Sequence, residues 1–305
     1  MSKAKATICV LVAGALWGCI SLFVRELSAA GLSSMDIAAV RVVVSAAGML
    51  IVVLVVDRSL LRIRLRDIWL FVGTGIISLT LFNLCYFTCI NLSEASIAVV
   101  LLYTSPVFVM VMSALFFKER ITIRKIAALI ATFAGCALVA GIFSGTMTIT
   151  PMALAFGIGS GFFYATYSIF GRVAVERYDA LTVTFYTFVA GSVAGLVLSD
   201  KAAIATATIA QPSLLAWFVG LGVLCTIVPC LLYTIGLKHL DPGKAAIFAT
   251  VEPLVGCLLG IFAYGESAGL NKILGIVLIL LAVFLANSDN AEQAEGNPPG
   301  EGANS

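Results

Sequence analysis

Long apolar runs separated by short polar connections dominate this sequence. A helix needs roughly 20 mostly apolar residues to cross the ~30 Å hydrocarbon core of a bilayer, and ten runs of about this length follow one another. They are Ala6–Val24, Ile37–Val56, Ile68–Ile90, Ala95–Phe117, Ile126–Phe143, Met152–Gly171, Leu181–Leu198, Leu214–Leu237, Gly243–Tyr264 and Leu270–Ala286. The pattern predicts an all-α integral membrane protein with ten transmembrane helices and no attached soluble domain.

One interval of 147 residues relates rare residue types in the two halves of the chain. The pairs are Arg25 and Arg172, Tyr86 and Tyr233, Pro106 and Pro253, Glu119 and Glu266, and Lys125 and Lys272. Apolar residues coincide often by chance, whereas repeated Arg, Pro, Glu, Lys and Tyr at one spacing are much less expected. The interval therefore predicts an internal repeat.

The repeat divides the chain into a first unit at 1–143, a second unit at 151–288 and a polar, disordered tail at 289–305. Each unit holds five spans. Because five is odd, the second unit must enter the membrane upside down relative to the first. Two inverted five-helix repeats are typical of secondary transporters, whose substrate site lies at the repeat interface near the membrane midplane.

Composition supports a membrane protein, since 61% of the residues are hydrophobic and only 11% are charged, against about 25% charged in soluble domains. The eight cysteines are scattered and form no CxxC pair, so we interpret them as apolar packing residues and expect no metal site. We expect no cofactor and no nucleic acid partner. The expected partners are the lipid bilayer and a small-molecule substrate.

The positions of the basic residues predict the orientation. With the N-terminus inside, all but four of the 18 lysines and arginines fall on the cytoplasmic side, as the positive-inside rule requires. The four exceptions are Arg25, Arg41, Lys201 and Lys272. We therefore expect a multi-pass protein of the cytoplasmic (cell) membrane with both termini in the cytoplasm.

Glu252 and Arg41 are the charged residues that lie well inside predicted spans, and intramembrane charges are functional candidates by default. Glu252 is the deeper of the two. It could take up a proton, pair with a cationic part of a substrate, or form a structural hydrogen bond to a neighbouring helix. Arg41 could extend to the membrane interface, or reach inward towards Glu252 or a substrate anion.

Pro106 and Pro253 occupy the centres of the fourth and ninth spans. Each lacks an N–H, so the carbonyls of Leu102 and Ala249 lose their intrahelical partner. A freed carbonyl at membrane depth is tolerated against protein or a wet cavity. Together with Glu252, the prolines predict kinked helices that line a hydrated cavity.

Polar and aromatic side chains recur at the middle of equivalent spans and complete the candidate cavity. Any single tyrosine is more readily explained by packing, but recurrence in both repeats favours a shared role. These further candidates are Trp17, Ser21, Asn83, Tyr86, Tyr103, Tyr164, Ser168 and Tyr233.

Four segments resemble the EamA-type transporters of the drug/metabolite transporter superfamily. They are GALWGCISLFVREL from Gly14, DIAAVRVVVSAAG from Asp36, SPVFVMVMSALFFKERIT from Ser105 and EPLVGCLLGIFAYGE from Glu252. The resemblance covers about Ala6 to Asn287. It implies ten helices in two inverted units and movement of small metabolites by alternating access.

The resemblance also carries hallmark positions onto this sequence, namely Trp17, Arg41, Pro106, Glu119, Pro253 and Glu266. Phe188 stands where the repeat would place a second Arg41, so the halves are not functionally equivalent. We expect Glu119 and Glu266, which end equivalent spans on opposite faces, to act structurally. They would accept hydrogen bonds from the following helix or pair with nearby basic residues.

The sequence predicts a secondary transporter that moves an amino acid or a similar small solute, with export as the favoured direction. We expect no enzyme, because the chain offers one histidine and no paired catalytic carboxylates, nucleophile with a base, or metal ligands. A facilitative channel or an uncoupled exchanger is the alternative. Proton antiport, substrate exchange and facilitated diffusion all fit the residues.

Overall fold

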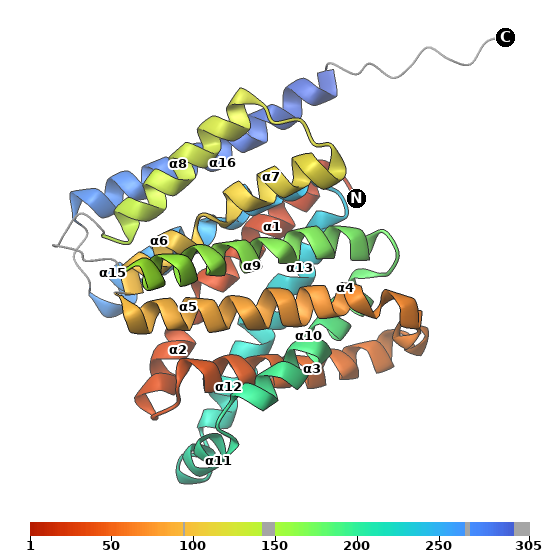
Figure 1. The fold of residues 1–305 in the computed structure, drawn as a ribbon, viewed down its shortest axis with the longest axis vertical. Coiled ribbons are helices and arrows are strands. Elements are labelled where there is room, and N and C mark those ends of the chain that lie inside the picture. The colour runs from red at the N-terminus through yellow and green to blue at the C-terminus, as the bar shows by residue number, and fades with distance from the viewer. Residues whose placement is uncertain (94, 142–149, 266–268, 296–305) are drawn as a thin grey trace.

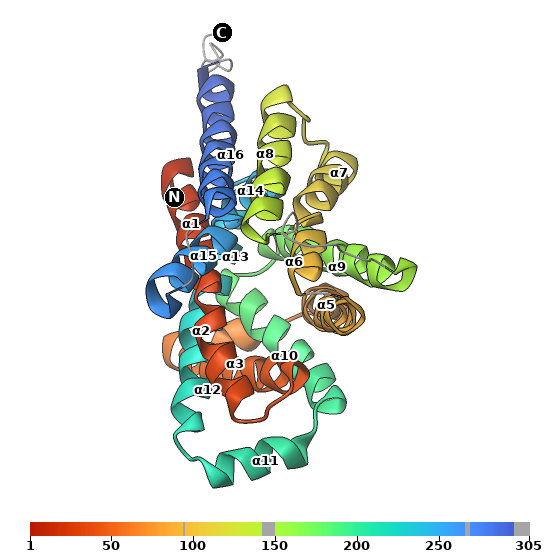
Figure 2. The ribbon, with the colours of Figure 1, turned by 90° about the vertical axis from the view of Figure 1, so that its left-hand side faces the viewer.

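The computed structural model describes residues 1–93, 95–141, 150–265 and 269–295, and these residues form helices and connections without a strand. The helices pack side by side in one bundle (Figures 1 and 2). The predicted all-α class is therefore confirmed for the described residues. Glu266 and residues 296–305 lie outside them.

In the first half of the chain, the described residues form α-helices together with three tighter or wider helical segments. They are α1 (Lys3–Gly18), α2 (Ile20–Ala29), α3 (Ser34–Val56), the 3-10 turns η1 (Arg58–Leu61) and η2 (Leu65–Asp67), α4 (Ile68–Val72), the π-helical segment η3 (Gly73–Thr80), α5 (Leu81–Leu92), α6 (Ala95–Leu102), α7 (Ser105–Phe117) and α8 (Ile123–Val139).

The second half is built in the same manner. Its elements are α9 (Pro151–Val175), α10 (Ala180–Leu198), α11 (Lys201–Ala210), α12 (Leu214–Gly222), the π-helical segment η5 (Val223–Ile227), α13 (Val228–Leu237), α14 (Pro242–Ala249), α15 (Val251–Tyr264) and α16 (Leu270–Glu295).

Nine stretches of the described residues are long and apolar enough to cross a membrane. Each overlaps one of the ten predicted runs. The remaining run, Ile126–Phe143, corresponds to α8, which has 17 residues and ends just before the undescribed segment 142–149. The helix α8 packs along α16 (Figures 1 and 2).

Equivalent helices of the two halves make equivalent contacts. The helix α3 packs against its counterpart α10, and α8 packs against its counterpart α16. The contact between α1 and α13 has its equivalent in the contact between α9 and α5. Such pairing is what an internal two-fold relationship between the repeats produces.

Both halves also contain a π-helical segment at an equivalent place. In η3 the hydroxyl of Thr80 donates to the carbonyl of Gly75 at 3.1 Å. Beside η5 the hydroxyl of Thr226 donates to the carbonyl of Leu221 at 2.9 Å. Each threonine thus satisfies a carbonyl five residues back, where an α-helical hydrogen bond is missing. Such π-bulges are frequent at functional sites.

The start of α3 is fixed by local hydrogen bonds and by the other repeat. Ser33 and Asp36 form a reciprocal capping box, which satisfies two free backbone donors of the first turn. The second carboxylate oxygen of Asp36 accepts from the backbone N–H of Asp200 at 2.8 Å. The capping box therefore also ties α3 to the end of α10.

Two features differ from the sequence prediction. The connection between Leu198 and Leu214 contains a further helix, α11, whose Ala-rich sequence has high helix propensity. The last helix, α16, continues to Glu295, so residues 289–295 are helical, where we expected the disordered tail to begin. The N-terminus and the end of α16 lie on the same side of the bundle as the α3–α4 connection (right-hand side of Figure 1).

Candidate functional site

Glu252 lies where the ninth span is interrupted. The helix α14 ends at Ala249, Thr250 forms a turn, and Glu252 stands in the first turn of α15. The fourth span is interrupted in the same way, since α6 ends at Leu102 and α7 begins at Ser105. The predicted proline kinks are thus complete breaks of the helix just before each proline.

The carbonyls released by these breaks pack against glycines of the opposite repeat. A Cβ on Gly14 of α1 would lie 2.7 Å from the carbonyl oxygen of Ala249. A Cβ on Gly161 of α9, the repeat equivalent of Gly14, would lie 3.2 Å from that of Leu102. The first contact is too close for a larger residue, and the second would require the neighbouring backbone to move, so glycine lets each broken helix approach its neighbour.

Three adjoining hollows meet at Glu252, with volumes of about 450, 100 and 20 Å³. The largest is within the ~300–1,000 Å³ range of small-molecule sites. All twelve residues that the sequence predicted for the cavity line at least one of these hollows. They are Trp17, Ser21, Arg41, Asn83, Tyr86, Tyr103, Pro106, Tyr164, Ser168, Tyr233, Glu252 and Pro253. We call these three hollows the central cavity.

Arg41 reaches the central cavity from the first third of α3. Its Nε atom is buried and has no hydrogen-bond partner among the residues that the structure describes. The residue lines the two larger hollows together with Glu252. The neighbouring backbone is fixed, because the hydroxyl of Ser45 donates to the carbonyls of Arg41 at 2.7 Å and Gly222 at 3.0 Å. Arg41 therefore reaches inward and does not extend to the membrane interface.

The carboxylate of Glu252 and the guanidinium of Arg41 share the cavity without touching. They form no ion pair within 4 Å, and no described side chain donates a hydrogen bond to Glu252. Opposite charges in a poorly solvated site attract strongly, and each costs free energy when it is left unpaired. The arrangement leaves both groups available to a ligand.

Aromatic rings form one wall of the cavity. The rings of Trp17 and Tyr233 lie 5.4 Å apart, and the hydroxyl of Tyr233 shares a hydrogen bond of 2.8 Å with that of Ser168. Phe82, which also lines the cavity, packs edge-on against Tyr164 at 5.1 Å. These contacts hold the rings in place in a cavity that Glu252 also lines.

Sequence reasoning missed several residues that line the same cavity. Phe82 and Tyr167 are aromatic neighbours of the residues it named, and Thr226 belongs to the π-helical segment of the eighth span. Tyr167 directly precedes Ser168, a predicted cavity residue, and this position could have identified it as a candidate. Neither Phe82 nor Thr226 carries a charge or a repeat partner of its own type that would have distinguished it.

The central cavity extends to one end of the bundle. Its lining includes Val24 near the end of the first span, Ser34 at the beginning of α3 and Ile90 near the end of α5. The residue Ala140, just after α8, also lines it. All four stand at the end of the bundle opposite to the N-terminus.

Hydrogen bonds between the repeats tie the other end together. Beyond the end of α3, Asp67 accepts from the Arg177 guanidinium at 2.6 Å and from the Tyr178 hydroxyl at 2.7 Å. The side chains of Thr182 and Tyr186 donate to carbonyls of the α3–α4 connection at 2.9 and 2.7 Å. These contacts hold the two halves together on the side of the chain ends.

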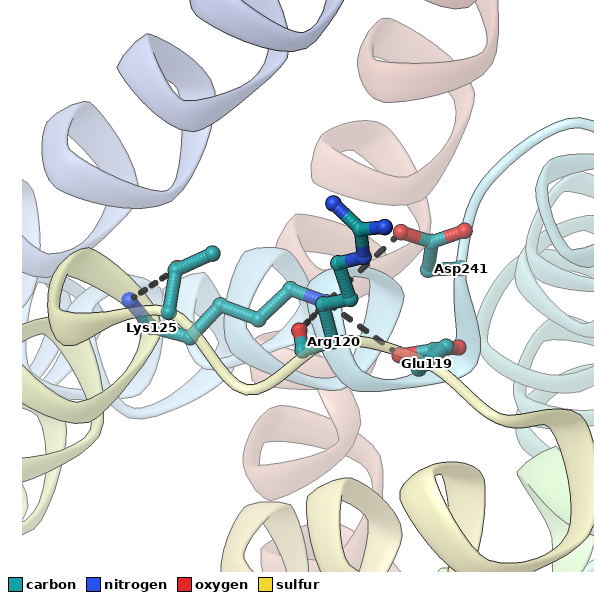
Figure 3. Close-up of polar contacts among 5 residues, drawn as sticks. Glu119, Arg120, Lys125 and Asp241 are labelled. Atoms are coloured by element: carbon teal, nitrogen blue, oxygen red, sulfur yellow. Dashed lines mark hydrogen bonds and ion pairs between the residues drawn. The ribbon is translucent and has the colours of Figure 1, made fainter.

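Glu119 belongs to a second tie at this end (Figure 3). The ammonium of the buried Lys125 lies 3.3 Å from the Glu119 carboxylate and 3.7 Å from that of Asp241, which comes from the other repeat. It also donates to the Arg120 carbonyl at 3.1 Å. Burial and, after it, the Asp241 carboxylate raise the pKa of Glu119 above its ordinary value, although Lys125 acts in the opposite direction. Glu119 thus pairs with a nearby basic residue, one of the two arrangements that we expected.

Comparisons with known proteins agree with this architecture. The family model described as the EamA-like transporter family matches twice, at residues 4–141 and 151–288. An uncharacterized transporter of Archaeoglobus fulgidus is 31% identical over 66% of this chain and 70% of its own length. The uncharacterized inner membrane transporter YicL of Salmonella typhimurium is 28% identical over 96% and 98%, respectively.

A solved structure shares the fold. One chain, described as a crystal structure of a protein, superposes with a TM-score of 0.80 at 18% identity and covers 96% of this chain and 99% of its own. Both halves of the chain thus match the same family model, and the whole helical architecture has an experimental counterpart.

Proposed function

We propose that this chain, which belongs to the EamA-like transporter family, is a secondary carrier for an amino acid or a similar small solute. It moves this solute across the cytoplasmic membrane by alternating access, in the direction of export. The membrane transporter class follows from the family. The solute, the direction and the mechanism are our proposal.

The observation that carries the proposal is the pair of unneutralised charges in one cavity. Glu252 can accept hydrogen bonds from an ammonium group, and Arg41 can donate to a carboxylate in the bidentate geometry that guanidinium favours. The aromatic faces of Trp17 and Tyr233 also favour a cation near the carboxylate. A solute with both an amino and a carboxyl group would satisfy both charges together.

Alternating access is supported by the asymmetry of the two ends. The central cavity extends towards Ser34 and Ile90, whereas Asp67, Arg177 and Tyr178 tie the opposite end. This asymmetry favours a carrier over a channel, since a channel needs a path open at both ends. The conformation then faces outward, and transport requires the ties between the repeats to open.

The topology that we propose has ten spans in two inverted units, with α8 as the fifth. The internal two-fold pairing of the helices supports it, and so does the position of both chain ends on one side of the bundle (Figure 1). The distribution of basic residues supports our proposal that this side faces the cytoplasm.

Counterflow in proteoliposomes tests the proposal. Vesicles loaded with a high concentration of unlabelled amino acid should transiently accumulate the labelled amino acid from a dilute outside solution. A carrier gives this overshoot because both solutes compete for one alternating site, whereas a channel does not. Flux that rises linearly with concentration and gives no overshoot would contradict the proposal.

A further inference from the structure

A basic hollow lies on the surface of the tied end, separate from the central cavity. It has a volume of about 980 Å³ and is lined in part by Arg62, Arg64, Arg66 and Arg177. Asp67 is the carboxylate among its lining residues, and Ile63, Trp69 and Tyr178 complete it. We call this site the arginine hollow.

The backbone that carries these arginines is held rigidly. The N–H of Arg64 donates to the Tyr178 hydroxyl at 3.1 Å, and this hydroxyl in turn donates to Asp67. The carbonyls of Leu60 and Leu61 accept hydrogen bonds from α10. These contacts order the connection between α3 and α4, and they do not involve the side chains of Arg62, Arg64 and Arg66. A site that is preorganised in this way loses less entropy on binding.

Most of the positive charge of the hollow has no carboxylate in ion-pair contact among the described residues. The carboxylate of Asp67 is occupied by Arg177 and Tyr178. Arg62, Arg64 and Arg66 are exposed and form no ion pair within 4 Å with a described residue. Three guanidinium groups are thus available to an anion, and guanidinium binds phosphate oxygens in a bidentate manner.

Apolar side chains next to the arginines indicate the depth of the hollow in the membrane. Leu65 is 82% exposed, and Ile68 and Trp69 are 42% and 48% exposed. The Trp69 ring stands edge-on against Phe170 at 6.0 Å, at the beginning of a membrane span. Tryptophan is enriched where the hydrocarbon core meets the headgroups. The arginines therefore lie at headgroup level.

We propose that the arginine hollow binds the headgroup phosphate of an anionic phospholipid. The guanidinium groups of Arg62, Arg64 and Arg66 would contact the phosphate, and Leu65 and Trp69 would contact the upper part of the acyl chains. Basic pockets next to transmembrane helices are suited to such headgroups. The lipid site does not depend on the proposed transport function. With the proposed topology, the lipid would belong to the cytoplasmic leaflet.

Native mass spectrometry of the full chain in a neutral detergent tests this site. The probes are dioctanoyl phosphatidylglycerol, dioctanoyl phosphatidylcholine and inorganic phosphate. The test variant replaces Arg62, Arg64 and Arg66 by Gln. The matched control removes the same charge elsewhere, by Lys3→Gln, Lys5→Gln and Arg120→Gln. A basic residue near the surface contributes about fivefold to anionic-lipid affinity, so three contribute on the order of a hundredfold.

The wild type and the control should retain phosphatidylglycerol, and the test variant should bind it on the order of a hundredfold more weakly. Equal losses in both triple variants would mean a diffuse surface effect and overturn the site. Equal binding of phosphatidylcholine would overturn the requirement for an anionic lipid. Arginine-dependent binding of inorganic phosphate that displaces the lipid would instead assign the site to a free anion.

A second measurement keeps the proposal testable if the triple Gln variant fails to fold. The Arg62→Lys, Arg64→Lys and Arg66→Lys variant keeps the charge and should retain most of the lipid. In nanodiscs, brominated phosphatidylglycerol should quench Trp69 more than brominated phosphatidylcholine does, as read from the difference between the wild type and Trp69→Phe. Identical quenching by the two lipids would overturn the site.

Discussion

A methyl group on Gly14 would lie 2.7 Å from the carbonyl oxygen of Ala249, the group whose intrahelical partner is removed by Pro253. The first span therefore packs directly on the break in the ninth span, beside Glu252. The same relationship recurs between Gly161 and the Leu102 carbonyl in the other repeat. In each repeat a glycine thus lets a helix of the other repeat pack on the break.

The close packing at the breaks predicts the effect of adding a methyl group. Gly161→Ala should lower the melting temperature, because its Cβ would meet backbone oxygens of α6 and overpacking costs about 1–3 kcal/mol. Gly159→Ala on the same helix is the control, since its Cβ would meet only the Cys85 sulfur at 3.6 Å. Thermal unfolding in detergent compares the two variants. Equal melting temperatures would contradict the packing account.

Glu119 should act in stability and not in substrate choice. Glu119→Ala removes the nearest carboxylate from the buried Lys125, which keeps Asp241 at 3.7 Å. The loss is then that of one hydrogen bond to a charged group, about 1.5–3 kcal/mol. Glu176→Ala, which breaks the exposed pair with Arg172 at 3.4 Å, is the control and should cost about 0–1 kcal/mol. Melting temperatures and a substrate panel measure both effects. Normal stability with altered selectivity would be the opposite result.

Topology can be measured with reporter fusions. A reporter after Arg62 and a reporter after Asp289 should both be on the cytoplasmic side, because an even number of spans returns the chain to the side where it starts. A reporter after Ile209 in α11 should lie on the other side. Chain ends on opposite faces would rule out ten spans.

Much of the fold can be predicted from the sequence because the signals for its helices are local. Each span is a run of apolar residues, and the interval of 147 relates residues that rarely coincide. The interruption of the first span at Cys19 was not predictable in this way, since no proline marks it. The π-helical segments were not predicted either, because the hydrogen bonds from the Thr80 and Thr226 hydroxyls to carbonyls five residues earlier are visible only in the folded helix.

The candidate cavity was predictable where polar side chains stand in apolar runs. Glu252, Arg41 and the prolines are conspicuous there for physical reasons, because lipid does not solvate charges or free carbonyls. Cavity residues without such a cost, such as Phe82, look like any packed side chain in the sequence. The ties that close one end combine residues far apart in the chain, such as Asp67 and Arg177, which no spacing rule relates.

Glu252 should link transport to pH if the carrier is proton-coupled. Glu252→Gln keeps the shape of the side chain and removes its titration. For a neutral solute, which has no ammonium group for Glu252 to bind, we expect the variant to retain binding and to transport the solute at a rate that does not change with pH. Uptake into proteoliposomes at a series of external pH values measures this. An unchanged pH profile would make Glu252 a structural hydrogen-bonding residue, with the carrier uncoupled or coupled elsewhere.

The central claim is that Arg41 and Glu252 bind the two charged groups of one solute. A thermal-shift screen of the purified protein against amino acids, organic cations, nucleosides and sugars tests it, because a ligand that binds only the folded state raises the melting temperature. At 100 times its dissociation constant, a ligand stabilises by about 2.7 kcal/mol. We predict that amino acids give the largest shift and that both Arg41→Gln and Glu252→Gln abolish it. A shift from sugars or nucleosides that persists in both variants would contradict the claim.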